Sequence, residues 1–217
     1  LQGFKNKSSG SSEEHYVLDY KMQQYRLFKG LAYSYCLLWN ARYIHSYIKG
    51  IQNRLEDGDN SAADDLPELH ATLSGLKATA TVTAHDNIEE ARKCCGGQGF
   101  LMSSGIAKLS PDFAEWVTVE GEQVILSLQC ARFLLKAVKQ VQSKSSTLTE
   151  TVRYIGETES DKNKNINVIT PSGILSLLKM RARNLAWRLT EQYDQQKGGD
   201  KDEALNQCAV IAVKAST

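Results

Sequence analysis

The chain has 217 residues, which suffice to bury the core of one domain of ordinary size, or of one domain and part of a second. Its 26 Lys and Arg residues nearly cancel its 25 Asp and Glu residues, which removes the simplest electrostatic case for a nucleic acid or an anionic membrane and favours a small-molecule or protein partner. No apolar run approaches the roughly 18 residues of a membrane span, so we expect a soluble protein, and, because the first residue is Leu, a piece of a longer one.

The first predicted helix covers about Glu14 to Leu55. Only three prolines interrupt the whole sequence, and the apolar residues between them recur at helical spacing, which predicts an all-α fold built as an antiparallel helical bundle. The apolar face of this first helix is wide, which predicts burial on two sides. It consists of Tyr20, Leu27, Leu31, Leu38, Ala41 and Ile48, with Phe28, Tyr35 and Trp39 beside them.

The second predicted helix begins at Asp65-Leu-Pro-Glu68, where an acidic cap, an early proline and a glutamate three residues later are typical of a helix start. It ends at Gly96-Gly97, because glycine commonly ends helices. Residues 98–117 are predicted to be irregular, and a third helix is predicted from about Val119 to Gln142.

The polar composition of residues 144–169 predicts a linker or a long surface loop. We therefore expect a first helical domain over residues 1–143 and the start of a second, truncated helical domain over residues 170–217. Within the second domain, Thr170-Pro171 predicts a capped helix start, and Gly198-Gly199 predicts the end of that helix.

Two short stretches contain residue types that chemistry would use. The glycines of Cys94-Cys-Gly-Gly-Gln-Gly-Phe100 either supply the positive φ of a helix end or let the backbone approach a ligand, and they do not match the GxGxxG dinucleotide fingerprint. Glu120 and Glu122 stand near a helix start, where acidic side chains complement the helix dipole. Gly121 between them is unfavourable unless something must come close to the backbone. From these residues alone, helix capping and a ligand site both stay open.

The histidines and cysteines predict no metal site. The four histidines are dispersed, and none pairs with another His or Cys at metal-ligand spacing. The five cysteines are odd in number and lack CxxC spacing, so we expect free thiols in a reducing compartment rather than disulfides or zinc ligands. Ser103-Ser104 lacks the surroundings of a nucleophile elbow, which argues against a serine hydrolase.

Taken together, several stretches resemble the acyl-CoA oxidases, flavoenzymes of the acyl-CoA dehydrogenase superfamily. They follow the family's order and spacing over about Phe4 to Lys139. The similar stretches are Val17-Leu-Asp-Tyr-Lys-Met-Gln-Gln-Tyr-Arg-Leu-Phe28 for VLDYxxQQxxLF, Leu66-Pro-Glu-Leu-His-Ala71 with Gly75-Leu-Lys77 for LPELHALxxGLK, Cys95-Gly-Gly-Gln-Gly-Phe100 for CGGHGY, Ser103-Ser-Gly-Ile106 for SSGL, Glu120-Gly-Glu-Gln123 for EGEN or EGDN, and Gln129-Cys-Ala-Arg-Phe-Leu134 for QxARFL.

The resemblance implies a C-terminal helical part of such an enzyme, with an N-terminal helical domain and a β domain before it, so that this piece alone should not turn over. By likeness, Glu120 is the catalytic base that removes the α-proton of a fatty acyl-CoA while the β-hydrogen leaves as hydride to N5 of FAD. Molecular oxygen then reoxidises the flavin, which gives trans-2-enoyl-CoA and hydrogen peroxide, the first step of fatty acid β-oxidation. The same likeness implies that Gly121 is close to the substrate, where a side chain would crowd flavin or substrate.

The resemblance also implies contacts with FAD. Gly96, Gly97 and Gln98 would bring backbone N–H groups to the cofactor, often that of the neighbouring subunit. Glu122 would touch the flavin and Gln24 its adenosine part; Gln24 also lies on the apolar stripe of the first helix, where a polar side chain needs a partner. The family further implies a homodimer, resident in a peroxisome or related microbody.

Some residues depart from the family's pattern and bear on chain-length preference and turnover. The departures are Gln98 for His, Phe100 for Tyr, Gln123 for Asn, Val119 for an aromatic residue and Ala107-Lys108 for Pro. Two alternatives stay open. One is an acyl-CoA dehydrogenase, which shares the base and the flavin but passes electrons to a carrier protein. The other is a non-catalytic helical interaction module, in which the glycine-rich turn and Glu120 are only helix caps.

Overall fold

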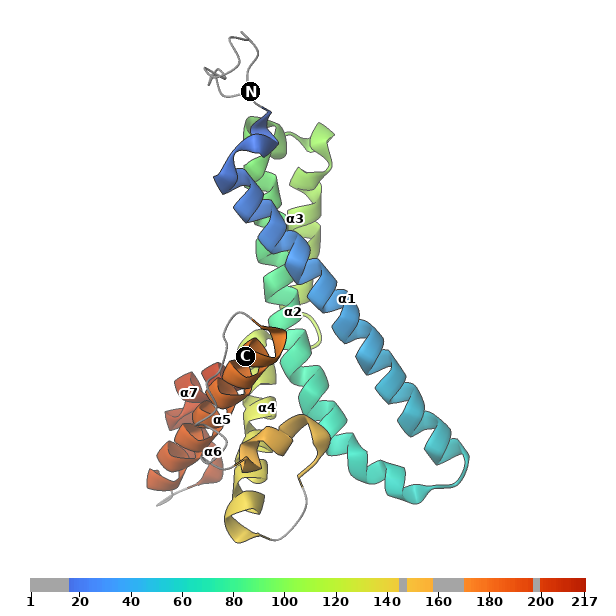
Figure 1. Ribbon diagram of the computed structural model, residues 1–217, viewed down its shortest axis with the longest axis vertical. Coiled ribbons are helices and arrows are strands. Elements are labelled where there is room, and N and C mark those ends of the chain that lie inside the picture. Colours follow the sequence, from blue (N-terminus) through green and yellow to red (C-terminus); the bar gives the residue numbers. More distant parts are fainter. Residues whose placement is uncertain (1–15, 145–147, 158–169, 197–199) are drawn as a thin grey trace. The chain divides into compact units, whose positions relative to one another are not determined.

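The computed structural model describes residues 16–144, 148–157, 170–196 and 200–217. These residues form helices and turns with no strand among them, which confirms the predicted all-α class (Figure 1). The α-helices are α1 (Lys21–Glu56), α2 (Leu66–Cys94), α3 (Ile106–Ala114), α4 (Gln123–Ser143), α5 (Pro171–Gln195), α6 (Lys201–Gln207) and α7 (Ala209–Ser216). The short 3₁₀ helices are η1 (Val17–Asp19), η2 (Asn60–Asp65), η3 (Gly96–Phe100), η4 (Met102–Ser104), η5 (Glu115–Val117) and η6 (Glu150–Gly156).

Local capping explains where α5 begins. The side chain of Thr170 accepts a hydrogen bond from the N–H of Gly173 at 3.1 Å, and Pro171 occupies the first helical position, where its missing N–H costs nothing. The predicted stop at Gly198-Gly199 lies outside the described residues.

Two helices begin later than the sequence predicts. The predicted start of the first helix, Glu14, lies outside the described residues, and α1 itself begins at Lys21, after the separate turn η1. The third predicted helix is α4, which begins at Gln123 instead of Val119. Glu120 and Gly121 have φ angles of 59° and 111°, and a right-handed helix excludes such values, so the helix cannot start before them.

The prediction that residues 98–117 are irregular is wrong for its second half. Ile106–Ala114 forms α3, with Pro111 inside it, between the 3₁₀ helices η4 and η5. A nine-residue helix is too short to show a clear apolar period, and its stability comes from tertiary contacts. One such contact is a hydrogen bond from the hydroxyl of Ser110, which is buried, to the carboxylate of Glu89 on α2.

The described residues form two compact units. The first contains the chain up to Tyr47 together with Ala80–Glu120, and the second contains Ile48–Thr79 together with Gly121–Thr217. The division therefore falls inside α1 and α2 and just before α4. The domain boundaries predicted from composition, with a linker over residues 144–169, stay a prediction.

In the first unit, polar contacts join the beginning of α1 to the end of α2. Arg26 and Glu90 form an ion pair at 2.8 Å, and the side-chain amide of Gln23 donates to the carbonyl oxygen of Cys94 at 2.9 Å. Contrary to the predicted burial on two sides, much of the apolar face of α1 is exposed within the described residues: Trp39 is 64% exposed and Tyr35 58%.

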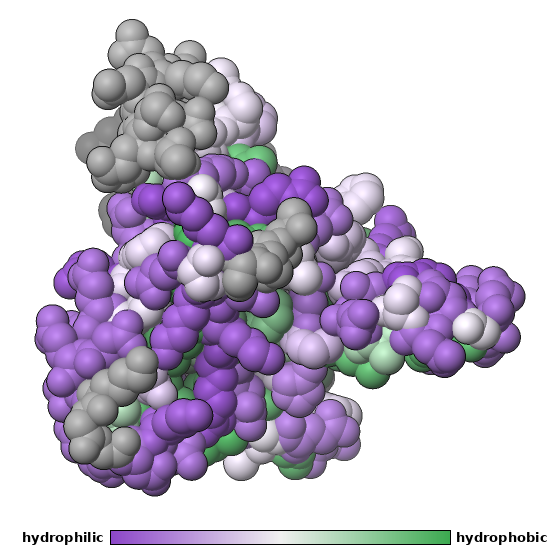
Figure 2. Space-filling model, turned by 90° about the horizontal axis from the view of Figure 1, so that it is seen from below, coloured by the Kyte–Doolittle hydropathy of each residue, from purple (hydrophilic) through white to green (hydrophobic). Residues whose placement is uncertain are grey.

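Hydrophilic residues dominate the face of the molecule drawn in Figure 2, and apolar residues appear as separate patches between them. This pattern fits a helical protein in which apolar side chains are divided between the interior and the surface. The described residues contain no helix that is long and apolar enough to cross a membrane.

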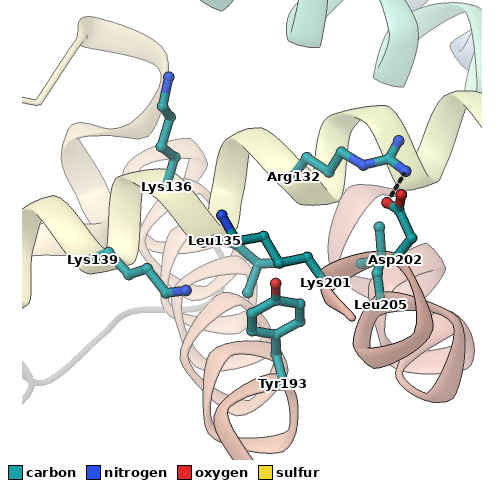
Figure 3. Close-up of a pocket in the computed structure, with 8 residues that line it drawn as sticks. All are labelled: Arg132, Leu135, Lys136, Lys139, Tyr193, Lys201, Asp202 and Leu205. Atoms are coloured by element: carbon teal, nitrogen blue, oxygen red, sulfur yellow. Dashed lines mark hydrogen bonds and ion pairs between the residues drawn. The ribbon is translucent and has the colours of Figure 1, made fainter. Parts of the chain in front are cut away.

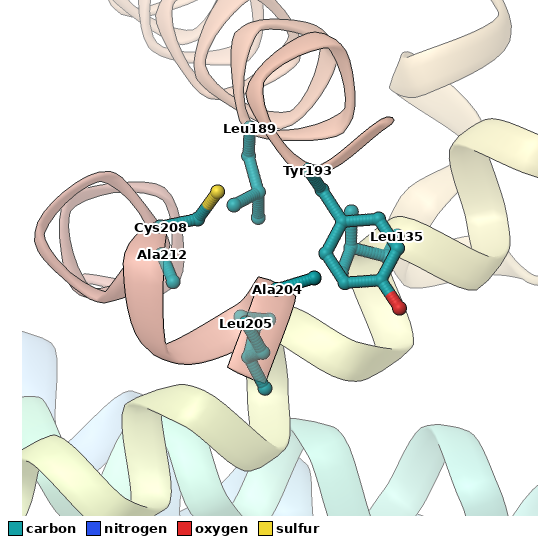
Figure 4. Packing of buried hydrophobic residues seen from close by; sticks show 8 residues of the cluster. Leu135, Leu189, Tyr193, Ala204, Leu205, Cys208 and Ala212 are labelled. Carbon is teal, nitrogen blue, oxygen red and sulfur yellow. The ribbon is translucent and has the colours of Figure 1, made fainter. Parts of the chain in front are cut away.

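The core of the second unit lies where α4, α5, α6 and α7 meet (Figure 4). Leu189 on α5 is fully buried, and the side chains of Leu205 and Cys208 converge on the same cluster. Ala131 on α4 and Ala212 on α7 are also fully buried, which allows these helices to approach each other closely.

The 3₁₀ helix η6 belongs to the second core cluster of this unit, although it lies within the predicted linker. Val152 and Ile155 are 5% and 0% exposed, and the indole N–H of Trp187 donates to the carbonyl oxygen of Ile155 at 3.2 Å. The segment is therefore packed despite its polar composition, because two well-placed apolar side chains are enough to anchor it.

Candidate active site

The glycine turn after α2 contains several glycines, and the structural reason for glycine differs from one position to the next. Gly96 has a φ of +58°, the left-handed conformation that glycine adopts readily at helix ends. A Cβ atom at buried Gly99 would collide with the carbonyl oxygen of Arg92, so the fold requires glycine there. Gly97 is exposed, and a Cβ atom there would meet no atom within 4 Å. The packing of the described residues therefore does not explain why position 97 is glycine.

Gln24 lies beside this turn. The hydrogen bond from neighbouring Gln23 to Cys94 brings the first turn of α1 against the end of α2. Gln24 is half-buried, and its side-chain oxygen accepts a hydrogen bond from the ammonium of Lys21 at 3.1 Å, so it has a partner within the chain. Gln24, Gly96, Gly97 and Gln98 thus gather at one end of the first unit.

The surface around this turn is apolar. Phe100 is 76% exposed and Met102 67%, and Gln98 is exposed between the glycines. Exposed large apolar side chains next to open backbone N–H groups provide a surface on which a planar group can stack.

Glu120 lies away from the glycine turn. Between the two stand the nine residues of α3 and the three of η5, and α3 leads away from the end of the first unit where α2 finishes (Figure 1). Glu120 is exposed and has a φ of 59°, a left-handed conformation that is uncommon for a residue with a side chain. The structure therefore does not bring Glu120 and the glycine turn of one chain together.

The two residues after Glu120 belong to the second unit. Glu122 is the N-cap of α4, and its carboxylate accepts a hydrogen bond from the N–H of Val124 at 2.8 Å, so the helix-capping interpretation holds for this residue. Gly121 has a φ of +111°, and a Cβ atom there would lie 2.8 Å from Cδ2 of Leu126. Glycine is therefore required at position 121 by both backbone conformation and space.

Sequence reasoning missed Lys77 as part of this site. Its ammonium group donates a 2.8 Å hydrogen bond to the carbonyl oxygen of Gly121. Lys77 occurs in the quoted LPELHA and GLK block, but no local pattern connects it with a residue 44 positions later. Contacts between segments so far apart in the sequence become visible only in the folded structure.

A carboxylate on α2 fixes α3 beside that helix. Arg92 pairs with Glu89 at 2.9 Å, and the hydroxyl of Ser110 donates to the same carboxylate. These interactions, the one with Arg92 first, lower the pKa of Glu89 from its ordinary 4.5 to about 2. The side chain is thus anionic over nearly the whole pH range in which proteins are stable, and it serves the packing of α3.

Both units have hollows on their surfaces. In the first unit an apolar groove of about 410 Å³ lies between α1, α2 and α3. Its lining residues are Arg26, Leu27, Gly30, Leu31, Ser34, Leu37, Ala84, Asn87, Ile88, Ala91, Ile106 and Leu109. Grooves of this size and apolar lining suit the hydrocarbon part of a small ligand.

One hollow of the second unit, of about 290 Å³, is lined in part by cationic side chains from α4 and α6 (Figure 3). Arg132 pairs with Asp202 at 3.3 Å. The ammonium of Lys139 lies 4.7 Å from the ring centroid of Tyr193 and 3.8 Å from a carboxylate oxygen of Asp194. Part of this positive charge is therefore used within the chain.

The cysteines are free thiols in different surroundings. Cys36 and Cys95 are exposed, whereas Cys208 is buried and Cys130 half-buried. Burial raises the pKa of the Cys130 and Cys208 thiols, which keeps them protonated and unreactive. Among the described residues, no group of three or more His, Cys, Asp and Glu side chains is arranged to hold a metal ion.

The family model and the similar proteins of known name indicate the same family. The family model described as "Acyl-CoA oxidase, C-alpha1 domain" matches residues 2–135. The chain is 36% identical to peroxisomal acyl-coenzyme A oxidase 1 of Mus musculus over 95% of this chain and 32% of that protein. It thus spans about a third of the length of the curated relatives that it matches.

Solved structures agree. The fold is similar to that of Arabidopsis thaliana acyl-CoA oxidase 1, with a TM-score of 0.84, 30% identity, and coverage of 98% of this chain and 32% of that one. It is also similar to acyl-CoA oxidase-2 of Caenorhabditis elegans bound with FAD, ascaroside-CoA and ATP, with a TM-score of 0.83 and 28% identity over 98% of this chain and 31% of that one.

Proposed function

The chain belongs to the acyl-CoA oxidase family, and on that premise we propose that it is the C-terminal helical part of an FAD-dependent acyl-CoA oxidase. The complete enzyme would convert fatty acyl-CoA to trans-2-enoyl-CoA and reduce O2 to H2O2, the first step of fatty acid β-oxidation. The observation that carries the proposal is Glu120, an exposed carboxylate on a left-handed backbone with no capping bond to explain it, unlike Glu122. Unfavourable backbone conformations cluster at functional sites.

Glu120 would act as the base. Its carboxylate takes the α-proton of the acyl thioester, and the electron pair of that C–H bond forms the new C=C bond as the β-hydrogen leaves. A carboxylate in water is too weak a base for this proton, so the site must exclude water when substrate is bound. Gly121, which has no side chain, would leave room for the substrate next to the base.

The residues at the glycine turn fit FAD. Position 97 is open to an external group, and the backbone at positions 96 and 97 is exposed beside Phe100. We propose that Gly96, Gly97 and Gln98 contact the cofactor through their N–H groups, Gln24 its adenosine part, and Glu122 its flavin. When bound, the flavin supplies an acceptor for the hydride.

The separation of the glycine turn from Glu120 supports a homodimer. Along the first unit α3 and η5 stand between the two, which favours contact of the turn with the cofactor of the neighbouring subunit. The apolar groove between α1, α2 and α3 would accept the acyl chain, since it offers hydrocarbon surface of the right kind. The mouse relative is named peroxisomal, and we propose a peroxisome or related microbody as the location of this protein too.

The test is peroxide release from a long-chain acyl-CoA by the full-length protein. Wild type, Glu120→Gln and the control Glu115→Gln, which changes another exposed carboxylate five residues earlier, are compared at equal flavin loading. We expect the rate to fall on the order of 1,000-fold in Glu120→Gln only.

Each other outcome has a definite meaning. Equal rates in all three proteins would remove Glu120 from the base role. Retained flavin and substrate oxidation without peroxide would indicate an acyl-CoA dehydrogenase that uses an electron carrier. Failure of the wild type to retain flavin would favour a non-catalytic helical module.

A further inference from the structure

The turn between η5 and α4 combines two unfavourable backbone conformations in consecutive residues. Glu120 has a φ of 59° and Gly121 a φ of 111°, and Glu122 then returns to extended backbone as the N-cap of α4. Glycine tolerates the second value, but a glutamate pays for the first with a clash between its Cβ atom and its own backbone. Contacts from outside the turn can support this conformation.

Lys77 provides such support from α2. Its ammonium donates to the carbonyl oxygen of Gly121 at 2.8 Å, and the contact is partly buried, so water competes with it less than at an exposed site. This carbonyl group changes direction if the backbone of Gly121 rotates. The bond therefore fixes the Gly121–Glu122 peptide, to which this carbonyl group belongs, and so helps to hold in place the residue directly after Glu120.

Leu126 holds the turn from the other side. Its Cδ2 atom lies 2.8 Å from the position that a Cβ atom of Gly121 would occupy, so the leucine side chain packs directly on the Gly121 α-carbon. The Gly121 backbone thus has a hydrogen bond on its carbonyl oxygen and a packing contact at its α-carbon. Of the two, only the bond to Lys77 is directional, and so it fixes the rotation of the Gly121–Glu122 peptide.

We infer that Lys77 is a positioning residue for Glu120: its bond to the Gly121 carbonyl oxygen anchors the residue that directly follows the base, so that the carboxylate is in place for the substrate α-carbon before substrate arrives. The inference rests on the proposed function. Lys77 does not touch the reacting atoms. It acts through Gly121, the residue that follows the base, and misplacing a base by about 1 Å costs on the order of 100-fold in rate.

The experiment uses full-length protein with bound FAD. Lys77→Met removes the donor but keeps the length of the side chain, Lys77→Arg keeps a cationic donor, and Lys136→Met is the matched control on the exposed face of α4. Reduction of the flavin by saturating acyl-CoA without oxygen is followed by its bleaching. We expect a fall of about 10-fold to 100-fold in Lys77→Met, partial recovery in Lys77→Arg, and KM within about twofold of wild type.

Two further measurements separate positioning from general stability. A 3-thia-acyl-CoA has sulfur in place of the β-carbon, so it can lose the α-proton but cannot give a hydride. The long-wavelength absorbance of the complex with this analogue, which reports proton removal by Glu120, should weaken in Lys77→Met. In the absence of any acyl-CoA, amide hydrogen exchange over residues 118–122 should become faster in Lys77→Met and remain unchanged in Lys136→Met.

The outcomes are separable from failure of the proposed function, which the Glu120→Gln comparison tests independently. Wild-type bleaching and wild-type exchange in Lys77→Met would overturn the inference and leave the oxidase proposal intact. A loss of rate in Lys77→Met explained entirely by loss of flavin, or by unfolding seen in circular dichroism, would also overturn it, because Lys77 would then be a stability residue. A wild-type enzyme that cannot bleach its flavin would end both proposals.

Discussion

Glu68 on α2 accepts hydrogen bonds from both the backbone N–H and the hydroxyl group of Thr151 in η6, 83 residues later in the chain. The N–H bond is 2.8 Å long, and only 5% of Glu68 is exposed. A buried carboxylate is costly unless its hydrogen bonds are made, and Thr151 supplies two of them. The pair therefore fastens η6 to α2 within the second unit.

Replacing this carboxylate should weaken the fold. We expect Glu68→Ala to lower the free energy of unfolding by about 2–3 kcal/mol, because it leaves two donors of Thr151 without their acceptor. Urea denaturation measures the change, and the exposed Glu150→Ala is the control. The double variant Glu68→Ala/Thr151→Val should lose less unfolding free energy than the sum of the losses in the two single variants. A loss equal to that sum would show that the two residues do not act together.

The stability of the first unit should depend on acid through Glu89. Its folded pKa of about 2 lies below the ordinary 4.5, chiefly because Arg92 donates to the carboxylate. A lowered folded pKa stabilises the protein above about 4.5, and this stabilisation is lost as the pH falls from 4.5 toward 2. The difference in Tm between wild type and Glu89→Gln should therefore shrink over that window. A difference that stays constant over that window would contradict this origin.

Two glycines with positive φ should respond differently to alanine. Gly58 has a φ of +84° with no atom within 4 Å of a built Cβ, whereas Gly121 has a φ of +111° and Leu126 at 2.8 Å. Gly58→Ala should cost about 1 kcal/mol from backbone strain alone. Gly121→Ala should cost about 2–4 kcal/mol, since overpacking adds to the strain. Leu126→Ala in the Gly121→Ala background should recover part of the loss, and no recovery would mean that strain alone is responsible.

Gly97 should matter for the cofactor and not for folding. Because a Cβ atom at position 97 meets nothing within 4 Å, Gly97→Ala should leave the Tm unchanged. If the backbone there contacts FAD, titration of the flavin-free full-length variant with FAD should show an affinity at least about tenfold lower than that of wild type. A loss of this size corresponds to about one lost close contact. Gly50→Ala, also at an open position, is the control and should bind FAD normally. Equal affinity in both variants would remove Gly97 from the cofactor site.

The apolar groove predicts a change of substrate preference. Leu109 on α3 lines the groove, and Leu109→Trp should fill part of its volume of about 410 Å³. The ratio of kcat/KM for a long against a short acyl-CoA should then fall by about tenfold or more, since each buried methylene contributes about 0.8 kcal/mol. Leu175→Trp, on exposed α5 surface, should keep the wild-type ratio. An unchanged ratio in Leu109→Trp would place the acyl chain elsewhere.

Sequence reasoning succeeded where the structural cause is local. The cap at Thr170 acts on a residue three positions later, and the acidic side chain of Glu122 caps the helix that follows it directly. The family blocks led to the acyl-CoA oxidases because they preserve residue identity over many positions, and the comparisons confirm that family. The roles assigned to Gln24, Gly96 and Glu120 stay predictions that the experiments above address.

Contacts between distant segments could not be predicted in the same way. Glu68 matches the glutamate of a capping box, yet in the fold its carboxylate turns to Thr151. Val152 and Ile155 lie in a stretch whose average composition is polar, and only the packing against Trp187 reveals them as core residues. The bond between Lys77 and Gly121 likewise exists only once α2 lies beside the start of α4.

Because the thiols differ in exposure, selective labelling can use them as reporters of cofactor binding and of unfolding. Cys95 is exposed and directly precedes Gly96, so an environment-sensitive dye attached there would change its emission when a cofactor arrives at the glycine turn. Exposed Cys36 and half-buried Cys94 would react in the same labelling step, so Cys36→Ser and Cys94→Ser are introduced to keep the dye on Cys95. Buried Cys208 would not react until the core of the second unit opens. The rate of its alkylation would therefore measure that opening independently.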